Sequence, residues 1–83
     1  VVVNDGARQA LFDVNANSLL LIGVVSINGY FEKGDIIRIH DAQGELLGLG
    51  KSQYHSDDAR ELMGKKAEKP LIYYDYMFLH DIN

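Results

Sequence analysis

The chain has 83 residues and a mass of 9.3 kDa, and with 47% hydrophobic and 24% charged residues its composition predicts one small globular domain. It has no cysteine, which excludes disulfides, thiolate nucleophiles and thiolate metal sites, and its size excludes the large enzyme architectures. Eight Lys and Arg against twelve Asp and Glu give a net charge of −4, which disfavours binding to nucleic acid or to an anionic membrane.

Neither a membrane span nor a targeting segment is predicted. The longest apolar run, residues 19–25, is far shorter than the ~20 residues of a membrane helix. The sequence begins at Val1, without an initiator methionine, a basic segment or a cleavage site. We therefore expect a cytoplasmic protein without membrane contact, and we interpret the chain as a piece of a longer one.

The first predicted elements are a short strand and a short helix. Residues 1–3 are a β-branched run that stops at Asn4 and Asp5. Either of these two side chains can cap a helix that runs through residues 7–11. This helix is barely two turns long.

Two strands separated by turns are predicted next. Residues 19–27 form an apolar run that predicts a buried strand, closed by a tight turn at Asn28-Gly29. A second turn follows at Lys33-Gly34. Residues 35–40 then predict a strand with apolar side chains on both of its faces, which is typical of a closed or double-layered sheet.

A hairpin and the second helix follow. Residues 41–44 predict a hairpin connection, and the glycines within residues 45–54 indicate a bent strand. Ser56 is the expected N-cap of a helix whose first turn carries two aspartates, and Gly64 is placed to end that helix.

The last predicted element is an aromatic strand over residues 71–79, after Pro70. Its aromatic side chains could stack on the bases of a single-stranded nucleic acid or pack in a thin core, and the lack of basic neighbours favours core packing. The aromatic residues are Tyr73, Tyr74, Tyr76 and Phe78. The elements together predict a mainly β domain with two or so short helices, in the form of a small barrel.

Local motifs suggest no catalytic residue and no metal site. Gly50-Lys51-Ser52 matches the end of a phosphate-binding loop, but that loop requires glycine at position 45, where this chain has Glu45. Ser56 has the surroundings of a helix cap rather than those of a nucleophile. The three histidines lack the spacing of metal ligands and are expected beside turns in solvent. They are His40, His55 and His80.

A longer pattern is more specific. It runs Leu20-x-x-Gly23-Val24-x-x-Ile27-x-Gly29-x-Phe31-x-x-Gly34-Asp35-Ile36-Ile37-x-Ile39, with Val3-Asn4-Asp5-Gly6-Ala7 before it and Tyr54-x-Ser56 after it. This pattern resembles the signature of PUA domains, which implies a PUA-like small pseudo-barrel over residues 1–83. Together with Tyr74-x-Tyr76 and His80-Asp81, it is most similar to the C-terminal domain of bacterial glutamate 5-kinases.

The signature residues also have a physical interpretation. Gly29 and Gly34 allow two turns around Phe31, whose ring is expected to fill the end of the barrel. Asp35 begins the next strand. The isoleucines of that strand are expected to fill the interior; they are Ile36, Ile37 and Ile39.

The resemblance implies two alternative functions, and the first is that of an accessory domain. Glutamate 5-kinases transfer the γ-phosphoryl group of ATP to the glutamate side chain in proline biosynthesis. This chain would be their regulatory or architectural PUA domain, without the N-terminal amino-acid kinase domain, and would be inactive alone. ATP and Mg²⁺ would belong to the kinase domain of the parent protein. The expected partner is that kinase domain or a neighbouring subunit.

The second alternative is RNA binding, because PUA domains of tRNA-modifying enzymes hold RNA beside the first helix. The residues that the resemblance suggests for RNA contact are Gly6, Ala7, Arg8 and Lys51. Residues 1–50 contain three basic and six acidic side chains, which disfavours this alternative. Convergence of Arg8, Lys33, Arg38 and Lys51 on one surface would favour RNA, whereas dispersion would favour contact with protein.

Overall fold

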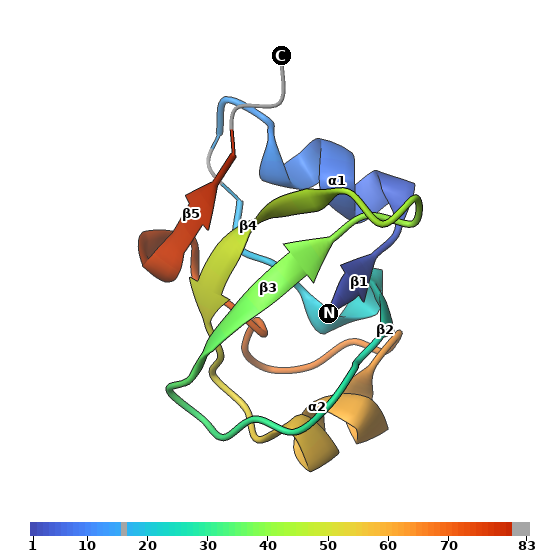
Figure 1. The fold of residues 1–83 in the computed structure, drawn as a ribbon, viewed down its shortest axis with the longest axis vertical. Helices are drawn as coiled ribbons and strands as arrows, with labels where there is room; N and C mark the ends of the chain where they lie inside the picture. Colours follow the sequence, from blue (N-terminus) through green and yellow to red (C-terminus); the bar gives the residue numbers. More distant parts are fainter. Residues whose placement is uncertain (16, 81–83) are drawn as a thin grey trace.

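The computed structural model describes residues 1–15 and 17–80. Within these residues the chain forms five strands, two α-helices and two short 3₁₀ helices (Figure 1). In chain order they are β1 (Val2–Val3), α1 (Asp5–Leu11), η1 (Leu21–Gly23), β2 (Val24–Ser26), β3 (Ile36–His40), β4 (Leu46–Lys51), α2 (Ser56–Leu62), η2 (Tyr74–Tyr76) and β5 (Met77–Leu79).

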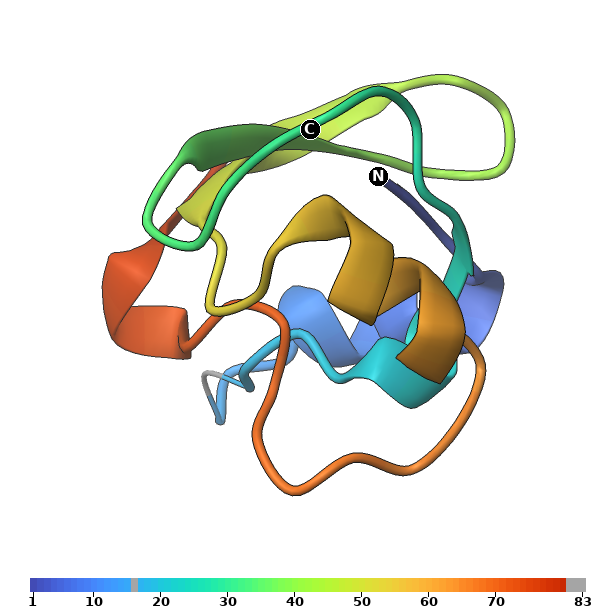
Figure 2. The same ribbon diagram turned by 90° about the horizontal axis from the view of Figure 1, so that it is seen from below.

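The strands form one mixed sheet in the order β2-β1-β3-β4-β5. β1 and β3 are parallel, and the other neighbouring pairs are antiparallel. Figure 2 shows β3 and β4 on one side of the molecule and both α-helices on the other. The predicted mainly β fold with two short helices is therefore confirmed.

The core lies between the sheet and the helices. Apolar side chains from all parts of the described chain are buried there: Val1, Val3, Leu11, Leu19, Leu21, Val24, Ile27, Phe31, Ile37, Ile39, Leu47, Ala59, Leu71 and Ile72. Phe31 is buried, as predicted. Within the described residues, no helix has the length and hydropathy that crossing a bilayer requires.

Helix α1 begins as predicted. The Asn4 side chain caps it, because the backbone N–H of Ala7 donates to Asn4 Oδ1 at 2.8 Å. Leu11 is the buried residue of this helix. Gly6 lies in the first turn of the helix and is exposed.

The prediction of one continuous strand over residues 19–27 is wrong. Leu19 makes an isolated bridge to Ile72, residues 21–23 form η1, and only residues 24–26 form β2. The physical reason lies at Gly23, where a Cβ atom would come within 2.5 Å of Ala7 Cβ. The chain therefore turns tightly against α1 at this point instead of extending.

Strand β3 has one buried face rather than two. Ile37 and Ile39 are buried, whereas Ile36 is 64% exposed. The expectation that Ile36 fills the interior is therefore wrong, because the helices cover only one side of the sheet and alternate residues of β3 face away from them.

The glycines of β4 allow close approach of neighbouring segments. A Cβ atom at Gly48 would overlap the backbone carbonyl of Phe78, and one at Gly50 would lie 2.6 Å from a methyl group of Ile72. These two positions therefore bring β5 and Ile72 against β4.

The predicted N-cap of the second helix is also corrected. His55 caps α2, because the backbone N–H of Asp57 donates to His55 Nδ1 at 3.1 Å. Ser56 is instead the first helical residue and is fully buried. Gly64 follows the helix with φ of +77°, as expected of a glycine that ends a helix.

The predicted final strand over residues 71–79 is interrupted, and its aromatic residues are not core residues. Residues 74–76 form η2, so regular alternation begins only at β5. Phe78 is 80% exposed, and the three tyrosines of this segment are 38–55% exposed. Core packing was therefore the wrong interpretation of these side chains, because Leu71 and Ile72 fill the core here.

Candidate functional site

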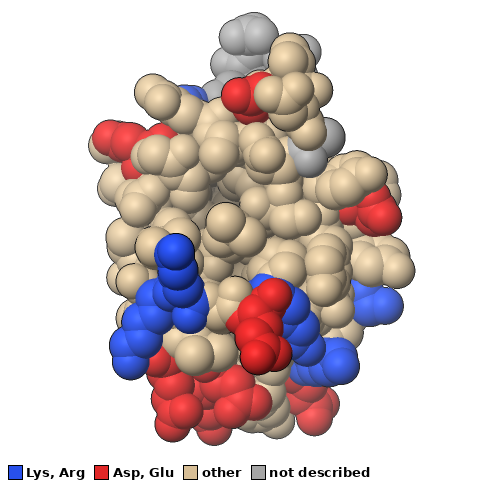
Figure 3. Space-filling model, turned by 180° about the vertical axis from the view of Figure 1, so that it is seen from behind, with Lys and Arg blue, Asp and Glu red and all other residues tan. Residues whose placement is uncertain are grey.

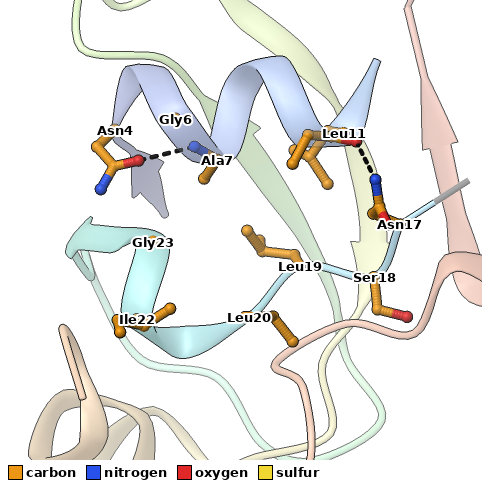
Figure 4. A pocket seen from close by; sticks show the side chains of 11 residues that line it. Asn4, Gly6, Ala7, Leu11, Asn17, Ser18, Leu19, Leu20, Ile22 and Gly23 are labelled. Carbon is orange, nitrogen blue, oxygen red and sulfur yellow. Dashed lines mark hydrogen bonds between the residues drawn. The ribbon is translucent and has the colours of Figure 1, made fainter. Parts of the chain in front are cut away.

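The face behind the sheet contains an apolar hollow beside α1. Figure 3 shows this face, on which most Lys and Arg side chains lie in the lower half, whereas the centre carries no charged side chain. A groove of about 490 Å³ lies between α1 and residues 17–23 (Figure 4). We treat it as the candidate site because Gly6 and Ala7 line it, as does the signature residue Gly23.

Three contacts hold the walls of this groove in place. Gly23 packs directly on Ala7, and its carbonyl accepts a hydrogen bond from the backbone N–H of Asn4 at 2.9 Å. At the other end, Asn17 Nδ2 donates to the carbonyl of Ala10 at 2.8 Å (Figure 4). The separation of the two walls is therefore set by one glycine contact and two hydrogen bonds.

The groove is apolar, and its described lining contains no charged residue. Leu19 is buried in its floor, while Leu20 and Ile22 are 55% and 49% exposed at its edge. Polar atoms come from Asn4, Asn17 and Ser18, all of which are uncharged. A site without a cation has little attraction for the phosphates of RNA.

Arg8 does not face the groove. Its Nε lies 3.3 Å from Asp41 Oδ2, and its guanidinium carbon lies 5.9 Å from the centre of the Phe12 ring. Asp41 is almost completely buried. The charge of Arg8 is therefore already neutralised within the domain.

Asp41 is the residue that the sequence analysis missed. Its Oδ1 accepts hydrogen bonds from the backbone N–H groups of Glu45 and Gln43, both at 2.9 Å. The bond from Glu45 contributes most to lowering the pKa of Asp41, and the bond from Gln43 and the charge of Arg8 add to it against the opposing effect of burial. The predicted turn over residues 41–44 could have indicated this role of Asp41, because the side chain of an aspartate often accepts hydrogen bonds from the backbone of its own turn.

Lys51 lies far from both the groove and Arg8. It is paired with Ile36 at the end of the β3–β4 ladder opposite to Asp41, so about 16 Å of strand separates it from the ion pair. Its ammonium group lies 5.2 Å from the centre of the Tyr76 ring. Of the four residues predicted for RNA contact, Gly6 and Ala7 line the groove, and Arg8 and Lys51 do not.

The other two cations do not assemble a basic surface at the groove either. Arg38 lies within β3, opposite Leu49. Lys33 precedes Gly34, whose backbone N–H donates to the carbonyl of Ser52, so Lys33 belongs to the end of the sheet near Lys51. The four cations therefore lie away from the groove: Arg8 is beside Asp41, and the other three are on or near β3 and β4.

The remaining signature residues support the loop between β2 and β3. Gly29 and Gly34 have φ of +75° and +97°, a conformation that favours glycine. Asp35 Oδ2 accepts from the backbone N–H of Glu32 at 2.9 Å, and Ser56 Oγ accepts from the backbone N–H of Phe31 at 3.2 Å. These residues hold Phe31 in the core and have no chemical role that the geometry reveals.

The three histidines do not come together. His55 caps α2 and packs edge-on against Tyr30, with ring centres 5.0 Å apart. Among residues 1–15 and 17–80 there is no group of three His, Asp or Glu side chains that could hold a metal ion.

Comparison with known proteins identifies the family. The model of the PUA domain family matches residues 1–74. The chain belongs to the PUA domain family. A conserved PUA domain protein from Thermoplasma acidophilum has the same fold, with a TM-score of 0.70 and 24% sequence identity over 87% of this chain and 45% of that one.

In sequence, this PUA domain is similar to glutamate 5-kinases. It is 43% identical over 77 residues to the enzyme of Bacteroides thetaiotaomicron, and 41% identical over 80 residues to that of Chlorobaculum tepidum. These matches cover 93% and 95% of this chain but 21% and 22% of the two relatives. The PUA domain is thus homologous to the C-terminal domain of glutamate 5-kinases and spans about a fifth of their length.

Proposed function

We propose that this PUA domain is the accessory domain of a cytoplasmic glutamate 5-kinase-like polypeptide. In this proposal an N-terminal amino-acid kinase domain holds ATP and Mg²⁺ and phosphorylates the side-chain carboxylate of glutamate. The PUA domain contacts the kinase domain or a neighbouring subunit, and its role is regulatory or architectural.

The observation that carries the proposal is that no described cation lines the groove beside α1. Arg8 is neutralised by Asp41, Lys51 lies at the opposite end of β4, and the groove beside α1 has no described cation. This arrangement favours contact with protein over contact with RNA, because each phosphate contact relies on a free cation. The similarity to glutamate 5-kinases over 93% of the chain supports the same parent protein.

The described residues also contain no set of side chains arranged for phosphoryl transfer. That reaction requires a phosphate cradle, carboxylates that hold Mg²⁺ and a cation that stabilises the transferred group. In residues 1–15 and 17–80, Gly50 and Lys51 lie in a strand rather than in a loop before a helix. Turnover in the parent is therefore assigned to the kinase domain.

The test is an assay of the complete polypeptide with ATP, Mg²⁺ and glutamate. We expect ADP to form only when glutamate is present, and we expect hydroxylamine to trap the acyl phosphate as a hydroxamate. Aspartate serves as the control substrate, and the 83-residue domain alone serves as the control protein. Absence of glutamate-dependent ADP formation by the complete polypeptide would refute the parent reaction, and turnover by the domain alone would refute the accessory role.

A further inference from the structure

The side of the sheet that faces away from the helices is uncovered. In Figure 1, β3, β4 and β5 form the nearest layer, and no described segment crosses in front of them. We define the outer face by five side chains: Ile36, Arg38, Leu49, Lys51 and Phe78. Its three apolar members are 64%, 39% and 80% exposed, respectively.

The strand register places these side chains beside one another. Arg38 is paired with Leu49, and Leu49 is paired with Phe78, so a cation, an aliphatic group and an aromatic ring form one row across three strands. Ile36 and Lys51 form the next row. Side chains that face each other across paired strands lie within contact distance.

The outer face is basic in an acidic protein. The residues of β3, β4 and β5 include Arg38 and Lys51 but no Asp or Glu, and Asp35 lies at the edge of the outer face, where it lines one hollow with Ile36 and Arg38. The rest of the sequence has six Lys and Arg against twelve Asp and Glu. The outer face is therefore complementary in charge to an acidic surface, although the domain as a whole is acidic.

The apolar part of the outer face favours a polypeptide over a single-stranded nucleic acid. Bases stack on aromatic rings, but Ile36 and Leu49 are aliphatic. The ammonium group of Lys51 already lies over the ring of Tyr76, which leaves Phe78 as the free ring of the outer face among the described residues. Aliphatic and aromatic groups together with two cations suit apolar side chains that are flanked by carboxylates.

The size of the outer face favours a partner within the same polypeptide. Three strands about 4.8 Å apart and up to six residues long present on the order of 300 Å², whereas a stable complex of separate proteins buries about 800 Å² on each partner. A linked partner needs less contact area, because a short linker raises its effective concentration to about the millimolar range.

We propose that the outer face docks on an apolar surface that carries Asp and Glu side chains elsewhere in the same polypeptide. This inference rests on the proposed function, since it requires that the chain be one domain of a longer protein.

The test is hydroxyl-radical footprinting of the complete polypeptide, with oxidation measured residue by residue by mass spectrometry. We compare the unmodified protein with the double variant Arg38→Glu and Lys51→Glu. Lys65→Glu with Lys66→Glu is the matched control, because it makes the same charge change in an exposed segment after α2. The buried Phe31 reports whether the domain is still folded in each protein.

We expect the outer-face variant to increase the oxidation of Phe78 by about threefold or more and to leave Phe31 unchanged, because acidic groups then repel the docked surface. The control variant should leave both residues unchanged. If Phe31 also becomes oxidised, Arg38→Gln with Lys51→Gln replaces the first variant, and the same rise at Phe78 is expected.

Three results would overturn the proposal. The first is rapid oxidation of Phe78 in the unmodified protein, with no further rise in the variant. The second is shielding of Phe78 that depends on protein concentration, which would assign the contact to a second copy of the chain. The third is shielding that requires an added oligonucleotide. The glutamate-dependent assay of the same samples is independent of the footprinting. The docking proposal and the proposed parent reaction can therefore be refuted separately.

Discussion

At the scale of single residues, Ser56 joins two distant segments of the chain. Its backbone N–H donates to the carbonyl of Phe31 at 2.9 Å, and its Oγ accepts from the backbone N–H of Phe31 at 3.2 Å. Both residues are buried, so water cannot replace the side-chain bond. Ser56 therefore fixes the position of Phe31 in the core.

Replacing Ser56 by alanine should lower the free energy of unfolding by about 1–3 kcal/mol, because the N–H of Phe31 would lose its acceptor inside the protein. Urea titration followed by circular dichroism measures the change. Ser26→Ala is the control, because Ser26 Oγ makes an exposed bond to Asn28, and its loss should cost less than about 0.5 kcal/mol. Equal effects of the two substitutions would contradict this role of Ser56.

Asp41 makes stability depend on pH. Its pKa is lower in the folded protein than in the unfolded chain, so its charge stabilises the fold above the unfolded pKa of about 3.9, and this contribution is lost as pH falls further. Asp41→Asn keeps an acceptor but removes the charge beside Arg8. We expect this variant to melt at a lower temperature than the unmodified protein at pH 7, and the gap to close below pH ~4. A gap that stays constant down to pH ~2.5 would rule out this explanation.

At the scale of elements, the contact between α1 and η1 depends on the lack of a side chain at one position. Gly23 lies against Ala7, and a Cβ atom there would come within 2.5 Å of Ala7 Cβ. Gly6, one residue before Ala7, has no atom closer than 3.5 Å to the position of an added Cβ. The two glycines of the signature therefore have opposite tolerance for alanine.

Gly23→Ala should destabilise the domain by about 1–3 kcal/mol, because the added methyl group forces α1 and η1 apart. Gly6→Ala, the matched control, should stabilise it by about 0.5–1 kcal/mol, because alanine is the better helix former. Thermal and urea unfolding measure both changes. If Gly23→Ala were neutral, the groove walls would not be held by this contact.

At the scale of the whole molecule, charge distribution bears on the two functions that the family suggests. The net charge is −4, Arg8 is paired with Asp41, and Arg38 and Lys51 lie on the sheet away from the groove beside α1. Electrostatic attraction supplies most of the non-specific binding of proteins to RNA. We therefore propose that the domain contacts protein rather than RNA.

We expect no saturable binding of the 83-residue domain to tRNA or to an unstructured RNA in fluorescence anisotropy, even at low salt. Binding that weakens at least about tenfold between low and physiological salt, and that is lost with Arg8→Glu plus Lys51→Glu, would instead establish the RNA-binding alternative. The same titration with Lys65→Glu plus Lys66→Glu would show whether any binding arises from the basic segment after α2.

The sequence by itself determined those features that depend on neighbouring residues. The Asn4 cap of α1, the positive φ of Gly29 and Gly34, and the buried ring of Phe31 follow from local backbone chemistry and from a pattern that resembles PUA domains. These features were sufficient to predict the fold class and the family.

Only the tertiary structure decided where the apolar and charged side chains point. The run over residues 19–27 and the aromatic segment over residues 71–79 both look like continuous strands, but η1, packed on α1 at Gly23, interrupts the first and η2 interrupts the second. Arg8 looks like a free cation until Asp41, which is distant in sequence, neutralises it. The Arg8–Asp41 contact joins residues more than 30 positions apart, and local patterns carry no information about which distant partner a side chain will meet.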